Sequence, residues 1–232
     1  MNQQHTLVLM PGLDGTGKLF APLIPLLEPH FRLIIVTYPD LDSFSEYVDC
    51  ARNQLPESGG FSLVAESFSG PVAMAIMAQP PGQIGPSVLS STFARSPLAA
   101  LTRMSNYVPE QMFSIGALSD FCLDVYEVND EDFSETQPLP LNVMEQLDGV
   151  LLKHRISVLS RIDVSALLPG IEIPILHLHG TQDRIVSETD ALMLQSNLPD
   201  VNRIDIDAPH LLLQTHPQQC AELIFNHVRA TT

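Results

Sequence analysis

Six short runs of apolar, β-favouring residues recur along the chain, and most are separated by segments with helical spacing. The runs cover residues 7–10, 33–36, 62–65, 87–89, 175–178 and 203–206. Most are continuous rather than alternating in polarity, which is typical of strands buried on both faces of a parallel sheet. Helical spacing is found in residues 19–27, 44–55, 71–78, 188–197 and 217–229. This alternation predicts an α/β fold with a doubly wound, mostly parallel sheet and right-handed crossovers.

One long segment interrupts the alternation. Residues 94–169 contain no convincing strand, and their Met- and Phe-bearing stretches have the character of short helices. A helical insertion between two strands commonly forms a cap over the carboxyl ends of the sheet, where open α/β sheets bind ligands. We therefore expect an α/β core made of residues 1–93 and 170–232, with residues 94–169 forming a helical cap.

Charge and cysteine content argue against several classes of protein. The chain has 232 residues, with 27 Asp and Glu against 11 Lys and Arg, and a formal charge of −16. Such a surface repels nucleic acid and anionic membranes. No apolar run approaches the ~20 residues that span a bilayer, and the first residues lack the features of a secretory signal. Three widely spaced cysteines fit a reducing compartment. We expect a cytoplasmic protein that neither binds nucleic acid nor inserts into a membrane.

The sequence AESFSG, residues 65–70, lies where a predicted strand meets a helix with almost nothing between them. Its order is that of the nucleophile elbow G-x-S-x-G, with Ala65 and Ser69 in place of the two glycines. Such a tight turn requires small residues, lifts the serine hydroxyl above the sheet edge and places it at the positive end of the following helix. The alternative is that Ser67 is only a helix N-cap. We favour Ser67 as a nucleophile.

A serine nucleophile needs a general base, and the base needs an acid that fixes its tautomer. Asp183 lies in the loop GTQDRIV after the fifth run, and His210 lies in DAPHLLLQTHP after the sixth. Both are expected at the same sheet edge as Ser67, in the chain order Ser, Asp, His. Asp207 and Glu188 are weaker candidates, because one fits the end of a strand and the other the first turn of a helix.

His177 and His179 share one face of a predicted strand, and two imidazoles on one face can bind a metal ion. The sequence has no evident third ligand, CxxC pair or HExxH motif to accompany them. We therefore favour packed core histidines, and we expect neither a metal nor a cofactor.

The segment PGLDGTGKLF, residues 11–20, is similar to a phosphate-binding loop. A nucleotide site of that kind needs a hydroxyl for magnesium, and Leu19 occupies that position. Lys18 is then expected to be an ordinary surface residue.

A serine nucleophile instead requires two backbone N–H groups aimed at the developing oxyanion. The amide of Phe68, directly after the nucleophile, is one candidate. The amide of Leu13 is the other, since Gly12 allows this first loop to approach closely. Asp14 is expected to stabilise the loop.

The chain resembles the α/β-hydrolases that carry a helical cap. The resemblance rests on PGLDG in the first loop, AESFSG at the elbow, GTQDRIV in the acid loop and APHLLLQTHP in the histidine loop. It covers nearly the whole chain but begins at the strand usually counted third, so the first two strands of the family are expected to be absent. The resemblance implies that Ser67 is the nucleophile, His210 the base and Asp183 the orienting acid, with the Leu13 and Phe68 amides as the oxyanion hole.

The expected activity is hydrolysis of a carboxylic ester through an acyl-serine intermediate, on a small-molecule ester with an apolar acyl group. Phe93, just after the fourth run, is a candidate wall of the substrate site. Apolar residues of the expected cap either line an acyl pocket or pack onto the core: Met104, Met112, Phe113, Leu118 and Phe121. Two alternatives remain open. One is a thioesterase or acyltransferase that uses the same catalytic residues with a different leaving group or acceptor, and the other is a non-catalytic ligand-binding module. GLDGTG and ESFSGP are also similar to an acyltransferase and lipase branch of the superfamily.

Overall fold

The structure, a computed structural model, describes residues 4–97 and 149–230. In this part of the chain six parallel strands form one sheet, in the order β2-β1-β3-β4-β5-β6. The strands are β1 (Thr6–Met10), β2 (Arg32–Ile35), β3 (Phe61–Glu66), β4 (Ser87–Ser90), β5 (Ile175–Gly180) and β6 (Val201–Ile206). Each coincides with a predicted run to within a few residues, so the predicted parallel sheet is confirmed.

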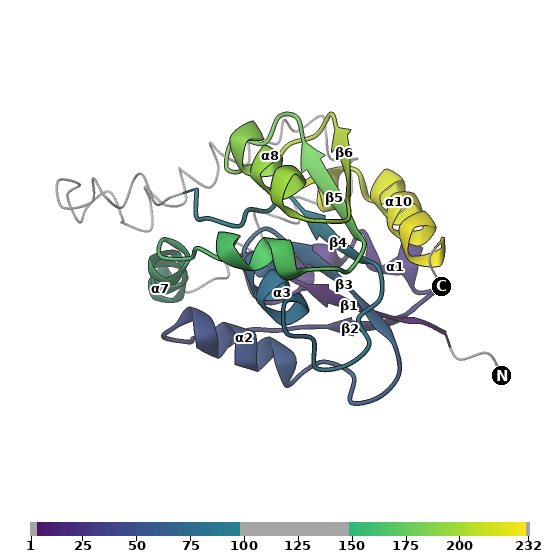
Figure 1. Cartoon of the computed structure of the whole chain (residues 1–232), viewed down its shortest axis with the longest axis horizontal. Helices are drawn as coiled ribbons and strands as arrows, with labels where there is room; N and C mark the ends of the chain where they lie inside the picture. The colour runs from purple at the N-terminus through teal and green to yellow at the C-terminus, as the bar shows by residue number, and fades with distance from the viewer. Residues whose placement is uncertain (1–3, 98–148, 231–232) are drawn as a thin grey trace.

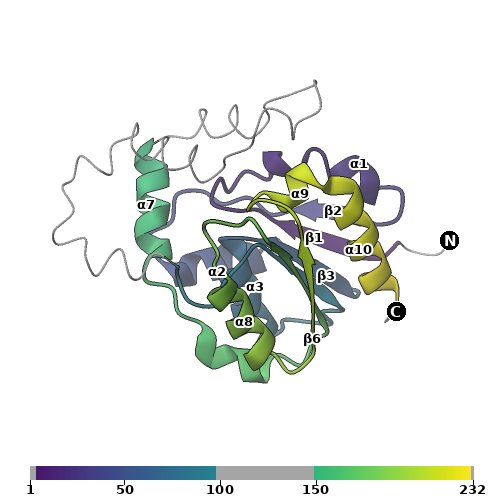
Figure 2. The same cartoon turned by 90° about the horizontal axis from the view of Figure 1, so that it is seen from above.

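Helices cover both faces of this sheet (Figures 1 and 2). One face carries α2 (Phe44–Arg52), α3 (Ser69–Met77) and α8 (Glu188–Asn197). The opposite face carries α1 (Ile24–Leu27), α9 (Leu212–Thr215) and α10 (Pro217–Arg229). Each face has its own cluster of buried apolar side chains, and the alternate residues of the buried strands contribute to one cluster or the other. The predicted doubly wound arrangement is confirmed.

Short-range signals fix where several helices begin. Ser43 caps α2, and its side chain and that of Glu46 each accept a hydrogen bond from the backbone N–H of the other. Ser187 and Asp190 form the same reciprocal pair at the start of α8. Pro217 begins α10, where its missing N–H is no loss. These signals explain why α8 and α10 begin at residues 188 and 217, as predicted.

The prediction of one continuous helix over residues 19–27 is wrong. The structure has a short 3-10 helix η1 (Lys18–Phe20), followed by the single turn α1. Pro22 lies between them and has no N–H to donate to a helical ladder, while Pro25 occupies the first turn of α1. Two prolines within four residues therefore divide the segment. Lys18 is exposed, as expected.

Residues 98–148, which include most of the expected cap and its five named apolar residues, lie outside the described residues. The rest of that segment contains α7 (Gly149–Leu159) and the 3-10 helix η4 (Ser165–Gly170). Its two ends adjoin, because Arg95 and Asp163 share a β-bridge and an ion pair of 2.9 Å between Nε and Oδ2. The division into core and cap stays a prediction.

In the described ranges, 4–97 and 149–230, we find no helix with the length and apolarity needed to cross a bilayer.

The parallel order brings several loops to one edge of the sheet. From β1 the chain continues to β2 on one side and then returns to form β3 on the other side of β1. The strand order therefore reverses between β1 and β3. Ligand sites of open α/β sheets lie at such a reversal, outside the carboxyl ends of the strands. The loops after β1, β3, β5 and β6 all begin at this edge.

Candidate active site

Ser67 lies in the sharp turn between β3 and α3. Its backbone has a φ of 47°, a left-handed conformation that is uncommon for a residue with a side chain. Such a conformation costs on the order of 1–3 kcal/mol and persists only where surrounding contacts impose it. The Ser67 N–H donates to Ser90 O at 2.9 Å, and its carbonyl accepts from the Gly70 N–H at 3.0 Å. The strained turn expected from AESFSG is therefore present.

The three side chains expected to act together form one hydrogen-bonded chain. His210 Nε2 lies 2.9 Å from Ser67 Oγ, and His210 Nδ1 lies 2.7 Å from Asp183 Oδ2. They come from the loops after β6, β3 and β5, and the His210 and Asp183 side chains are 3% and 0% exposed. With Asp183 ionised, Nδ1 carries the proton, and Nε2 is left to accept from the serine hydroxyl.

Asp183 is held as a carboxylate by its surroundings. Its second oxygen, Oδ1, accepts hydrogen bonds from the backbone N–H groups of Ile185 at 2.8 Å and Val186 at 2.9 Å. Burial by itself raises the pKa of this carboxyl, but the charge and hydrogen bond of His210 and the two amides outweigh burial, so the pKa is lowered overall. Asp183 therefore stays ionised at neutral pH, with Oδ2 at hydrogen-bond distance from the imidazole.

The other candidate acids have different partners. Asp207 Oδ1 accepts from Thr181 Oγ1 at 3.1 Å and from Gln182 Nε2 at 2.9 Å, which joins the loops after β5 and β6. Glu188 forms two bonds with the Arg203 guanidinium, at 2.9 and 2.5 Å. Both carboxylates are thus engaged in structural contacts.

His177 and His179 are both buried on β5, with ring centroids 6.1 Å apart. Burial, assisted by the charges of His179 and Arg203, lowers the pKa of His177 to about 3, so this imidazole is neutral. Across the described residues we find no group of three His, Cys, Asp or Glu side chains that is suited to a metal ion.

The first loop, residues 11–17, lies against the elbow. Its backbone turns tightly, since the Gly15 N–H donates to Gly12 O at 3.1 Å. Asp14 Oδ2 accepts from the Thr16 N–H at 2.9 Å and from Thr16 Oγ1 at 2.6 Å, which agrees with its expected stabilising role. A Cβ added to Gly12 would lie 3.8 Å from Ser67 Cβ. Only a glycine-sized gap therefore separates the first loop from the elbow at this point.

The two amides expected to form the oxyanion hole both have their hydrogens available. Neither the Leu13 N–H nor the Phe68 N–H donates to an acceptor within residues 4–97 and 149–230. Phe68 is the residue before α3, and N–H groups at the start of a helix have no partner inside the helix. Both amides can therefore donate to an incoming oxygen atom.

Two side chains that support the elbow were not predicted. The Ser69 hydroxyl donates to Pro11 O in the first loop and accepts from Tyr38 Oη at 2.9 Å. The serine in place of the second elbow glycine therefore ties the elbow to the first loop. Thr92 Oγ1 donates to Ser67 O at 2.6 Å. The position of Ser69 inside the motif was a usable signal, whereas nothing in the local sequence marks Thr92.

Glu66, directly before Ser67, is an unexpected buried carboxyl. Neither of its oxygens has a hydrogen-bond partner in the described residues. Burial raises its pKa to about 7, against an opposing effect of the Gln214 side chain and with a smaller raising contribution from the charge of Asp14. The motif small-x-Ser-x-small allows any residue at position 66, so it did not indicate that a carboxyl would be buried there.

Phe93, the candidate wall of the substrate site, is 1% exposed and belongs to the apolar cluster under α2 and α3. Its contact with a substrate stays a prediction.

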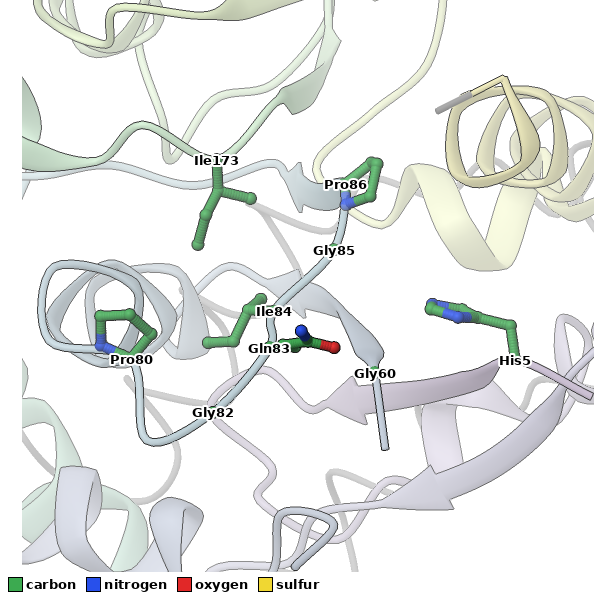
Figure 3. A pocket seen from close by; sticks show the side chains of 9 residues that line it. All are labelled: His5, Gly60, Pro80, Gly82, Gln83, Ile84, Gly85, Pro86 and Ile173. Atoms are coloured by element: carbon green, nitrogen blue, oxygen red, sulfur yellow. The ribbon is translucent and has the colours of Figure 1, made fainter. Parts of the chain in front are cut away.

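A separate cavity of about 480 Å³ lies at the opposite edge of the sheet (Figure 3). Its lining includes His5, Gly60 and Pro86, which directly precede β1, β3 and β4. This cavity is therefore remote from Ser67.

Comparison with known proteins gives the fold. No family model matches the chain, and no curated protein matches it either. Solved structures match over almost the entire chain. An enol-lactonase from Burkholderia xenovorans LB400 has a TM-score of 0.79 at 18% identity, over 98% of this chain and 92% of that one. A lipase-esterase related protein from Clostridium acetobutylicum ATCC 824 has a TM-score of 0.81 at 17% identity, over 98% and 96%.

A third structure, MGS-M2, is described as an alpha/beta hydrolase enzyme from a Medee basin deep-sea metagenome library. It has a TM-score of 0.79 at 15% identity, over 100% of this chain and 91% of that one. Together with the six-stranded parallel sheet, these matches confirm that the chain has the α/β-hydrolase fold.

Proposed function

We propose that the protein is a serine hydrolase that cleaves a carboxylic ester through an acyl-Ser67 intermediate. The observation that supports this most directly is the use of both His210 ring nitrogens, one toward Ser67 Oγ at 2.9 Å and one toward Asp183 Oδ2 at 2.7 Å. A histidine oriented in this way by a buried carboxylate is a competent general base.

In the acylation step, His210 Nε2 takes the proton from Ser67 Oγ as Oγ attacks the carbonyl carbon of the ester. The carbonyl oxygen becomes an oxyanion and accepts hydrogen bonds from the Leu13 and Phe68 amides. His210 then gives its proton to the departing alkoxide oxygen, the ester C–O bond breaks, and the alcohol leaves. Asp183 remains ionised and stabilises the imidazolium.

In the deacylation step, His210 takes a proton from water as the water oxygen attacks the acyl carbon. The same two amides stabilise the second oxyanion. The bond between the acyl carbon and Ser67 Oγ then breaks, and His210 returns the proton to Oγ. The carboxylic acid leaves and the starting state is restored.

The substrate is proposed to be a small-molecule ester with an apolar acyl group. Two of the proteins with this fold are described as an enol-lactonase and a lipase-esterase related protein, which agrees with a carboxylic ester as substrate. The apolar acyl group rests on the Met and Phe residues of the expected cap.

Covalent labelling with a fluorophosphonate tests the proposal. The wild-type protein and Ser58→Ala, an exposed control, should each gain the mass of one phosphonyl group and hydrolyse p-nitrophenyl esters. Ser67→Ala should do neither while remaining folded by circular dichroism. Labelling or turnover in Ser67→Ala would place the nucleophile elsewhere. A folded wild-type protein that neither labels nor turns over would favour a binding module. Rates on a matched acyl-thioester distinguish an esterase from a thioesterase.

A further inference from the structure

Arg155, on α7, is a buried arginine whose guanidinium contacts the first loop. The residue is 2% exposed. Nη1 donates to Leu13 O at 2.9 Å and to Asp14 O at 2.5 Å, across more than 140 residues of sequence. The two carbonyls directly follow the amide that we assign to the oxyanion hole.

The same guanidinium also contacts the segment that follows β2. Nη2 donates to Tyr38 O at 2.6 Å and to Pro39 O at 3.3 Å. Tyr38 is itself bonded to the first loop, since its N–H donates to Gly15 O at 2.8 Å. Arg155 therefore joins two neighbouring loops through four backbone carbonyls.

The first loop is shaped to admit this guanidinium. Gly15 has a φ of 66°, and a Cβ added there would lie 2.4 Å from Arg155 Nη1, well inside a tolerable contact. A residue with any side chain at position 15 would displace the guanidinium. Burying a cation is costly unless its N–H groups are paired, and the four carbonyls supply partners for Nη1 and Nη2.

We infer that Arg155 is a positioning residue for the oxyanion hole. The turn from Gly12 to Gly15 has only one internal backbone hydrogen bond, from the Gly15 N–H to Gly12 O. That bond fixes the peptide that carries the Leu13 N–H, and Arg155 fixes the next carbonyl, Leu13 O, and the one after it, Asp14 O. Two successive peptides are then held in place, and the Leu13 N–H beside them is held as well.

This inference rests on the proposed function, because an oxyanion forms only if Ser67 attacks a carbonyl. It also gives α7 a part in the reaction, since a displacement of this helix would release the first loop. Arg155 does not touch the reacting atoms and acts through Leu13.

The test compares Arg155→Met and Arg155→Lys with wild type and with Arg161→Met, an exposed arginine on the residues after α7. Arg155→Met removes all four hydrogen bonds while keeping a side chain of similar length. Arg155→Lys keeps the positive charge but has one nitrogen where two are needed. Measured quantities are kcat and KM on p-nitrophenyl butyrate, the second-order rate of fluorophosphonate labelling, and inhibition by an alkyl boronic acid. The boronate adduct of Ser67 places an oxygen in the oxyanion hole.

We expect Arg155→Met to lower kcat and the labelling rate by ~10- to 100-fold, less than the ~10²–10³ lost with an entire donor. Boronate affinity should fall by a similar factor, while KM and the pH midpoint of kcat/KM stay near the wild-type values. Arg155→Lys should be intermediate, and Arg161→Met should behave as wild type. Added methylguanidine should partly restore the activity of an Arg155→Ala variant.

Unchanged boronate affinity in a folded Arg155→Met or Arg155→Lys protein would overturn the inference. So would a loss of activity that merely follows a lowered melting temperature and disappears on cooling. A wild-type protein that is folded but does not label at Ser67 would instead overturn the proposed function, and this inference with it.

Discussion

Thr92, two residues after β4, donates a hydrogen bond of 2.6 Å from its Oγ1 to the carbonyl oxygen of Ser67. The Ser67 carbonyl also accepts from the Gly70 N–H, so both acceptor positions of this strained peptide are used. The contact explains how the left-handed conformation at Ser67 is maintained: a neighbouring strand, and not the elbow alone, fixes the turn.

Gly70→Ala should disturb the elbow. A Cβ at position 70 would lie 1.8 Å from Thr92 Oγ1, so Thr92 would have to leave the Ser67 carbonyl. We expect a loss of about 1–3 kcal/mol in unfolding free energy, as for other overpacked sites, together with a reduced kcat. Chemical denaturation and ester hydrolysis measure the two effects. Gly82→Ala is the matched control, because a Cβ there meets no atom within 4 Å. Equal stability of the two variants would contradict the role given to Thr92.

Asp183→Asn should inactivate the protein without unfolding it. The amide is nearly isosteric, but it no longer stabilises a charged imidazole and favours the wrong tautomer of His210. We expect kcat to fall on the order of 10³- to 10⁴-fold with a small change in KM. Steady-state kinetics provides the measurement, and Asp200→Asn, an exposed carboxyl, serves as the control. If Asp183→Asn retained a tenth of the wild-type kcat, another acid would have to orient His210.

The pKa of Asp183 also predicts the acid side of the stability profile. Because its pKa in the folded protein is lower than its ordinary value of 3.8, the carboxylate stabilises the fold at higher pH. That contribution is lost as the pH falls through the folded-state pKa. Unfolding by acid, followed by circular dichroism, should therefore depend less on pH below about 4 in Asp183→Asn than in wild type.

Ser69→Ala should weaken the link between the elbow and the first loop. The substitution leaves Pro11 O and the Tyr38 hydroxyl without their present partner in a buried site. An unpaired buried polar group costs about 1–3 kcal/mol. The double variant Ser69→Ala with Tyr38→Phe should be less destabilised than the sum of the single variants, because the orphaned hydroxyl is gone. Simple additivity in a double-mutant cycle by urea unfolding would argue against the bond.

Glu66→Gln should make the protein more stable at alkaline pH. Glu66 has a folded-state pKa of about 7 against an ordinary value of 4.5, chiefly because of burial, so the folded state binds its proton more tightly than the unfolded state. The wild-type protein therefore loses stability as the pH rises from about 4.5 to 7, by up to about 3 kcal/mol. The neutral amide removes this loss.

The comparison needs unfolding free energies at pH 4.5 and pH 8. The stability gain of Glu66→Gln over wild type should appear at pH 8 and be small at pH 4.5. Glu57→Gln, at an exposed position, should show no such dependence. A gain that is the same at both pH values would mean that Glu66 is not held protonated by its surroundings.

The sequence by itself determined the core of this fold. Strands such as residues 62–65 and 175–178 were predictable because burial on both faces demands continuous apolar runs, and parallel strands must alternate with helices. The elbow was predictable for a local reason: the turn after β3 requires small residues two positions before and after Ser67, here Ala65 and Ser69. Once the strands were known, chain order alone assigned the loops of Asp183 and His210 to the same edge of the sheet.

Only the tertiary structure decided which side chains support that site. Arg155 and Thr92 lie outside any recognisable motif, and Glu66 occupies a position of the elbow motif that can be any residue. Their roles come from contacts with residues distant in sequence or from burial. Hydrophobic periodicity reports which face of an element is buried, because burial acts on every residue of that face. A hydrogen bond between a guanidinium and a loop carbonyl depends instead on the path of the whole chain between them, and no local pattern encodes that path.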